Sequence, residues 1–129
     1  MPDSQISSYR DLIVWQRAIE TSIAVYRFTS SFPREEVYGL TSQIRRASVS
    51  VASNIAEGYG RLSRDQYRHF LTIANGSNFE LQTQLVIAKE LGMGDALEAA
   101  KIERMSLEVS KMLVAMLKKL RSQPAAPLL

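Results

Sequence analysis

The sequence contains no cysteine, and this absence excludes several kinds of chemistry. A chain without thiols has no disulfide framework, thiolate metal site, iron–sulfur cluster or cysteine nucleophile. His69 is the only histidine, and Gln66 rather than a glutamate lies three residues before it, so the Glu-x-x-His pairs of a di-iron bundle are missing. Glu57 and Glu80 alone are too few carboxylates to predict a magnesium site. We therefore expect no metal site and no cofactor.

Long uncharged apolar runs are also missing. Residues 1–9 have neither a basic start nor an apolar core, and no window approaches the roughly 18 apolar residues of a membrane span. We therefore expect a cytoplasmic protein with no membrane partner. The chain of 129 residues, 46% hydrophobic and 22% charged, has the size and composition of one folded domain.

Apolar residues recur three and four positions apart along most of the chain, as is typical of amphipathic helices. Pro33 ends the first such stretch, because it disfavours helical geometry in the residue before it. Gly58 and Gly60 end the second, while Ser63 and Asp95 have side chains that cap the start of a helix. Three of the predicted helices cover residues 12–30, 63–91 and 95–121. The second helix along the chain is predicted to begin between residues 35 and 40 and to end at residue 57. In the first helix the stripe expected to face the core consists of Leu12, Trp15, Ile19, Ile23 and Tyr26.

Four amphipathic helices with short links, and no strand-like alternation, predict an all-α fold. The expected architecture is an antiparallel up-down-up-down four-helix bundle over residues 11–121. A flexible N-terminus is expected at residues 1–10, and a disordered tail at residues 122–129.

Positive charge is clustered along the chain. The net charge of +3 is a mild excess, but residues 40–75 hold five arginines against Glu57 and Asp65 only. Guanidinium groups fit phosphate oxygens, and a tyrosine ring offers a face on which a base can stack. The alternative is a basic corner with no ligand. The predicted nucleic-acid-binding residues are Arg45, Arg46, Tyr59, Arg61, Arg64 and Arg68.

Polar residues at helical spacing suggest a second feature. Asn54 and Glu57 lie three positions apart in the second helix, and Glu80 and Gln84 lie four apart in the third, so each pair shares a helical face. If the two faces meet, the four residues form a polar network that fixes the register of the helices or contacts another subunit. A ligand-binding role is the alternative.

Arg64 and His69 provide the enzymatic alternative. Their spacing resembles the Arg-x4-His signature of metal-independent ribonucleases built on helical bundles. In such an enzyme the histidine would move the proton of the 2′-hydroxyl and the arginine would stabilise the phosphorane. The competing interpretation is a solvent-facing His69 that hydrogen-bonds Asp65 one turn away.

Three stretches carry a family resemblance: residues 11–18 (DLIVWQRA), 38–47 (YGLTSQIRRA) and 54–61 (NIAEGYGR), continued by Gly76-Ser77 and residues 80–85. They resemble the bacterial four-helix-bundle proteins encoded by intervening sequences within 23S ribosomal RNA genes, a likeness that spans roughly residues 9–120. Two positions differ from the family: Asn75 replaces a residue that is commonly basic, and Gln82 replaces one that is commonly acidic.

The resemblance implies a homopentamer, because that family is similar to a set of small pentameric proteins that includes the accessory protein of diversity-generating retroelements. It also implies an RNA or DNA partner and no catalytic reaction. The sequence therefore favours a non-catalytic, nucleic-acid-binding bundle. The alternatives are a scaffold that binds another protein, such as a polymerase, and a ribonuclease that uses Arg64 and His69.

Overall fold

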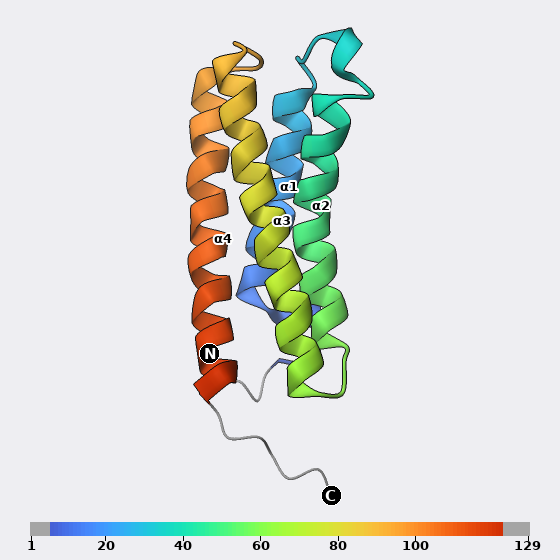
Figure 1. Ribbon diagram of the computed structural model, residues 1–129, viewed down its shortest axis with the longest axis vertical. Coiled ribbons are helices and arrows are strands. Elements are labelled where there is room, and N and C mark those ends of the chain that lie inside the picture. The colour runs from blue at the N-terminus through green and yellow to red at the C-terminus, as the bar shows by residue number, and fades with distance from the viewer. Residues whose placement is uncertain (1–5, 123–129) are drawn as a thin grey trace, which may run out of the picture.

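The computed structural model describes residues 6–122, and these residues form helices with no strand among them. Figure 1 shows the four long helices side by side, with α1 and α3 running one way and α2 and α4 the other. Each packs against two neighbours: α1 and α3 each contact both α2 and α4. The predicted all-α four-helix bundle is confirmed. Its elements are η2 (Tyr9–Asp11), α1 (Ile13–Thr29), η3 (Arg34–Glu36), α2 (Leu40–Tyr59), α3 (Arg64–Glu90) and α4 (Ala96–Ser122).

Local signals in the sequence set most helix ends. Ser63 caps α3 by accepting the N–H of Gln66 at 3.1 Å, and Asp95 accepts the N–H of Glu98 at 3.0 Å. Gly92 follows α3 with a φ of 69°, in the left-handed region that glycine adopts without a Cβ clash.

The N-terminal segment expected to be flexible overlaps the described residues only from residue 6. There Asp11 accepts hydrogen bonds from the backbone N–H groups of Ser7 and Ser8, at 2.8 and 3.2 Å. These bonds, led by the one from Ser7, lower the pKa of the Asp11 carboxyl. Residues 1–5 and 123–129, the rest of the predicted flexible N-terminus and most of the predicted tail, lie outside the described residues.

The core has two apolar layers. One lies toward the end with the α1–α2 and α3–α4 connections and includes Phe28, Ile44 and Leu85; the other lies toward the end with the α2–α3 turn and includes Ile55 and Leu71. The predicted core stripe of the first helix is wrong in part, because Ile23 and Tyr26 are 48% and 45% exposed. The buried side of α1 instead carries Val14, Ala18, Thr21, Ser22, Val25, Phe28 and Thr29. Helix α1 is therefore apolar on a second face, which the bundle covers at Trp15 and Ile19 only in part and leaves exposed at Ile23 and Tyr26.

Buried polar side chains separate the two apolar layers. Ser22 of α1 and Ser48 of α2 share a hydrogen bond of 3.1 Å. Between α3 and α4, Asn78 donates to the carbonyl of Ser106 at 2.8 Å, and the Ser106 hydroxyl donates back to Asn78 Oδ1 at 2.7 Å. Gln82 also donates to this hydroxyl at 3.0 Å. The polar atoms are paired, so the layer joins adjacent helices at a fixed height.

Ser106→Ala is expected to lower the free energy of unfolding by about 1–3 kcal/mol, because it leaves the buried Oδ1 of Asn78 without its donor. Ser110→Ala, one turn further along α4, removes only a partly buried bond of 3.2 Å to Asn75 and is expected to cost under about 1 kcal/mol. Urea unfolding of both variants checks the prediction. If both variants lost the same free energy of unfolding, the buried polar layer would contribute no more to stability than the partly buried bond.

Candidate nucleic-acid interface

The turn between α2 and α3 forms a compact corner at the lower end of the bundle in Figure 1. Gly58 brings the two helices close together there. A Cβ added at Gly58 would lie 2.8 Å from Phe70 Cβ and 3.1 Å from Tyr67 Cδ1. The corner therefore places side chains from the end of α2 directly against the first turns of α3.

Aromatic rings form the floor of this corner. The rings of Tyr59 and Tyr67 meet edge to face with centroids 6.3 Å apart. The guanidinium of Arg61 lies 4.6 Å from the centroid of the Phe70 ring. Burial of Tyr67, followed by its electrostatic interaction with Tyr59, raises the pKa of the Tyr67 hydroxyl above its ordinary value.

The arginines of the corner make long, exposed ion pairs. Arg61 lies 3.9 Å from Glu57, and Arg68 lies 3.9 Å from Asp65. Pairs of this kind stabilise a protein by about 1 kcal/mol or less, so a phosphate group can replace either carboxylate at little cost. Arg64 opens α3 and is half-buried. Four of the six predicted residues, Tyr59, Arg61, Arg64 and Arg68, thus lie at this end of the bundle, where α2 ends and α3 begins.

The other two predicted residues lie elsewhere. Arg46 is thirteen positions before Tyr59, the last residue of α2, or about 20 Å along the helix axis. Arg45 turns toward α1, where its Nε donates to Thr29 Oγ1 at 2.7 Å and its guanidinium lies 4.6 Å from the ring centroid of Tyr26. Arg45 is therefore engaged in packing α1 against α2, and the predicted set does not form one continuous site.

Within residues 6–122, no hydrogen bond joins any two of the four residues of the predicted polar network. Asn54 donates to the carbonyl and hydroxyl oxygens of Ser50, at 2.8 and 3.0 Å. Glu57 pairs with Arg61, as above. Gln84 is 6% exposed, and its Oε1 has no hydrogen-bond partner. A contact of these residues with another subunit remains a prediction.

Glu80, the remaining member, lies in a groove between α2 and α3. The groove has a volume of about 440 Å³, and Arg46 also contributes to its wall. A hydrogen bond of 2.8 Å between Ser50 and Ser77 joins the two helices beside it. The full lining consists of Tyr38, Ser42, Gln43, Arg46, Ala47, Ser50 and Glu80.

His69 is exposed, and its ring lies edge-on to Phe70 with centroids 5.7 Å apart. Residues five apart on an α-helix point about 140° away from each other around the axis. Arg64 and His69 of one chain therefore do not converge on a common point. Among residues 6–122 no group of three or more histidine and carboxylate side chains is placed to hold a metal ion.

The antiparallel fold adds basic residues from the end of α4. The C-terminus of α4 lies at the same end of the bundle as the α2–α3 turn (Figure 1). We call the part from this end up to the level of Arg17 and Glu108 the basic end, because its basic residues clearly outnumber its acidic ones. The described basic residues are Arg10, Arg17, Arg61, Arg64, Arg68, Lys111, Lys118, Lys119 and Arg121, and the acidic ones are Asp11, Glu20, Glu57, Asp65 and Glu108.

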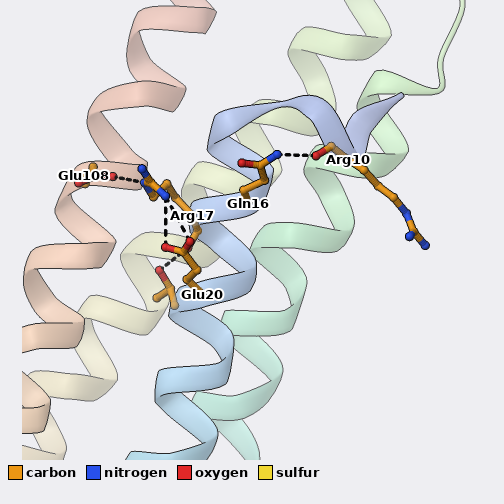
Figure 2. Close-up of polar contacts among 6 residues, drawn as sticks. Arg10, Gln16, Arg17, Glu20 and Glu108 are labelled. Atoms are coloured by element: carbon orange, nitrogen blue, oxygen red, sulfur yellow. Dashed lines mark hydrogen bonds and ion pairs between the residues drawn. The ribbon is translucent and has the colours of Figure 1, made fainter. Parts of the chain in front are cut away.

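The basic residues of this end differ in how strongly neighbouring carboxylates hold them. Arg17 of α1 donates to Glu108 of α4 at 2.9 Å and lies 3.2 Å from Glu20, so its charge is compensated (Figure 2). Arg10 lies nearby with its side chain directed away from these residues, while its carbonyl accepts from Gln16 at 2.8 Å (Figure 2). The opposite end of the bundle has nearly balanced charge. Its described charged residues are Arg27, Arg34, Arg45, Arg46, Lys89 and Lys101 against Glu35, Glu36, Glu90, Asp95 and Glu98.

Comparison with known proteins identifies the family. The family model for the 23S rRNA-intervening sequence protein matches residues 10–115. The chain belongs to this family. The match includes α1, α2, α3 and most of α4, so the resemblance inferred from the sequence is confirmed.

A crystal structure supports the fold of this 23S rRNA-intervening sequence family member. It is a protein of unknown function from the S23 ribosomal protein family of Bacteroides thetaiotaomicron, with a TM-score of 0.74 and 22% sequence identity. The similarity covers 82% of this chain and 99% of that chain. No curated protein matches the chain. Within residues 6–122, the helices are too short or too polar to cross a membrane.

Proposed function

We propose that this 23S rRNA-intervening sequence family protein binds nucleic acid through its basic end, without catalysing a reaction, and acts in the cytoplasm. The observation that carries the proposal is the group of three arginines, Arg61, Arg64 and Arg68, at the end of the bundle where α2 turns into α3, with the guanidinium of Arg61 over the ring of Phe70. RNA is the preferred partner, because the family takes its name from intervening sequences of 23S rRNA. The proposed contacts are electrostatic, from guanidinium groups to phosphate oxygens.

The arrangement supports this function because the cations lie on an ordered scaffold. The weak pairs with Glu57 and Asp65 exchange readily for phosphates, and the ring of Phe70 lies beneath the guanidinium of Arg61. Binding of this kind releases counterions from the nucleic acid, so its affinity falls steeply as salt is added.

The proposed assembly is a homopentamer. The pentamer follows from the resemblance of the sequence to pentameric proteins, and uncovered apolar side chains on two helices support contact between copies. Helix α1 leaves Ile23 and Tyr26 exposed. On α3 and directly after it, the exposed apolar residues are Ile73, Phe79, Val86, Ile87 and Leu91, with exposures from 39% to 62%.

The same apolar surface favours a second candidate, a scaffold that binds another protein such as a polymerase. In that case a protein would co-purify with the chain, and charge changes at the basic end would leave its binding unaffected. The ribonuclease candidate has less support, since Arg64 and His69 diverge around α3. If purified protein cleaves RNA, unchanged cleavage by His69→Ala would exclude the histidine mechanism.

The test is the absolute mass of the purified protein by light scattering, with its ultraviolet absorbance spectrum recorded before and after a high-salt wash. We expect a mass of about five times the 14.5 kDa of one chain, with nucleic acid that the wash removes. A monomer free of nucleic acid would contradict both the assembly and the partner. A co-purifying protein without nucleic acid would favour the scaffold.

A further inference from the structure

Leu62 has the highest exposure, 105%, of the large apolar side chains within residues 6–122. A single exposed leucine is ordinary on a protein surface, and exposure alone assigns it no role. Its position is unusual in that it lies between Arg61 and Arg64 on the turn at the tip of the basic end (Figure 1). An apolar side chain here is flanked in the sequence by two of the residues proposed to hold phosphates.

Hydrogen bonds fix the backbone on both sides of Leu62. Before it, the N–H of Gly60 donates to the carbonyl of Ala56 at 3.2 Å, and the N–H of Arg61 to that of Gly58 at 3.1 Å. After it, the hydroxyl of Ser63 caps α3. The turn therefore presents Leu62 on an ordered backbone, and little conformational entropy is lost when this side chain is covered by a ligand.

We propose that Leu62 is an apolar wedge that packs against the face of an unstacked or terminal base while Arg61 and Arg64 hold the adjoining phosphates. The inference rests on the proposed function and names its substrate class. Proteins that contact nucleic acid insert leucine and similar side chains at base steps, and base faces are accessible in single strands, loops, bulges and helix ends. An uninterrupted duplex covers these faces by stacking, so the wedge favours the unpaired forms.

The charges around Leu62 favour a polyanion that also offers apolar surface, and nucleic acid meets both conditions. The arginines supply the attraction to phosphate at any sequence. Leu62 adds a contact that does not depend on salt, because it involves no ion. The two contributions can therefore be separated by measuring affinity as a function of salt concentration.

The experiment uses the full chain and fluorescence anisotropy with a labelled single-stranded RNA and a blunt duplex of the same length. Leu62→Ala is expected to weaken binding of the single strand by about fivefold to tenfold at every salt concentration, without changing the salt slope. Leu62→Phe is expected to restore or exceed the wild-type affinity, since a phenyl ring stacks on a base. Binding of the duplex should change little.

Leu97→Ala is the matched control. Leu97 is 81% exposed in the first turn of α4, at the opposite end of the bundle, and its replacement is expected to leave RNA binding unchanged. Both leucines are exposed, so thermal unfolding of the variants should match that of the wild type and exclude misfolding as a cause.

Three outcomes would overturn the wedge. If the wild type binds the single strand and Leu62→Ala binds it equally well, the wedge is wrong while the proposed function stands. If the wild type binds neither RNA, both fail. If Leu62→Ala retains RNA affinity but loses binding to vesicles of phosphatidylcholine and phosphatidylserine, the leucine serves a lipid surface instead.

Discussion

Replacing Arg61, Arg64 and Arg68 together by glutamine is expected to weaken binding of a short single-stranded RNA by about 100-fold at roughly 0.1 M salt. Each arginine that neutralises a phosphate of a single strand contributes about 0.7 to the slope of log affinity against log salt. Loss of three such contacts reduces the magnitude of the slope by about two, which corresponds to a loss of about two decades of affinity at this salt concentration. Anisotropy titrations at several salt concentrations measure both quantities.

The matched control carries the same change in charge at the other end of the bundle. Arg27, Arg34 and Lys89 are exposed there, and replacing them by glutamine also reduces the net charge from +3 to zero. The control is expected to lose affinity by less than about threefold, through the weaker long-range attraction alone. Equal losses in the two variants would mean that the RNA responds to the overall charge, and the basic end would have no special role.

The sequence was sufficient to predict the architecture, because local signals mark the helix boundaries. Pro33, the cap at Ser63 and the stop at Gly92 act on residues next to them in the chain, and the structure has a helix end at each. On α3, Leu71, Asn78 and Leu81 recur at helical spacing in the sequence, and all three are buried. Local patterns do not depend on which helices become neighbours.

Helix α1 shows where periodicity fails. It carries apolar side chains on two faces, and the larger residues Trp15, Ile23 and Tyr26 favoured the face that the bundle does not bury fully. Periodicity identifies apolar faces without indicating whether the chain itself or another molecule covers them. Ala18 and Val25 face the core because the small residues of α2, such as Ala47 and Ser48, let this side approach closely.

The site was predictable only in part, for a similar reason. Arg45 and Arg46 are adjacent in sequence, but one helical step of about 100° directs Arg45 to Thr29 on α1 and leaves Arg46 beside α3. The pairing of Asn78 with Ser106 depends on the height of α4 relative to α3, which the connection between them sets. Lys118 and Arg121 join the basic end because α4 runs antiparallel to α3 (Figure 1). Each of these facts requires the relative placement of two helices.

That connection makes Gly94 the position where we expect the largest loss of stability from a single methyl group. Gly94 has a φ of 76°, and a Cβ there would lie 2.8 Å from Cζ of Phe28 and closer still to its Cε1. Phe28 is 1% exposed and packs edge to face on Phe32, so its ring has little freedom to move. Left-handed strain of about 1–2 kcal/mol adds to overpacking of about 1–3 kcal/mol, and Gly94→Ala is expected to lower the free energy of unfolding by about 2–5 kcal/mol.

Gly92→Ala separates the two causes. Gly92 has a similar φ of 69°, but apart from Gly92 itself and its two chain neighbours no atom lies within 4 Å of the position that its Cβ would take. Its replacement is expected to cost only the backbone strain, about 1–2 kcal/mol, in the same urea unfolding experiment. If both variants lost the same amount, the loop between α3 and α4 would yield to the methyl group, and the contact with Phe28 would not fix it. A larger loss at Gly94 would mean that the packing of Phe28 beneath this loop holds α4 at the height that aligns Ser106 with Asn78.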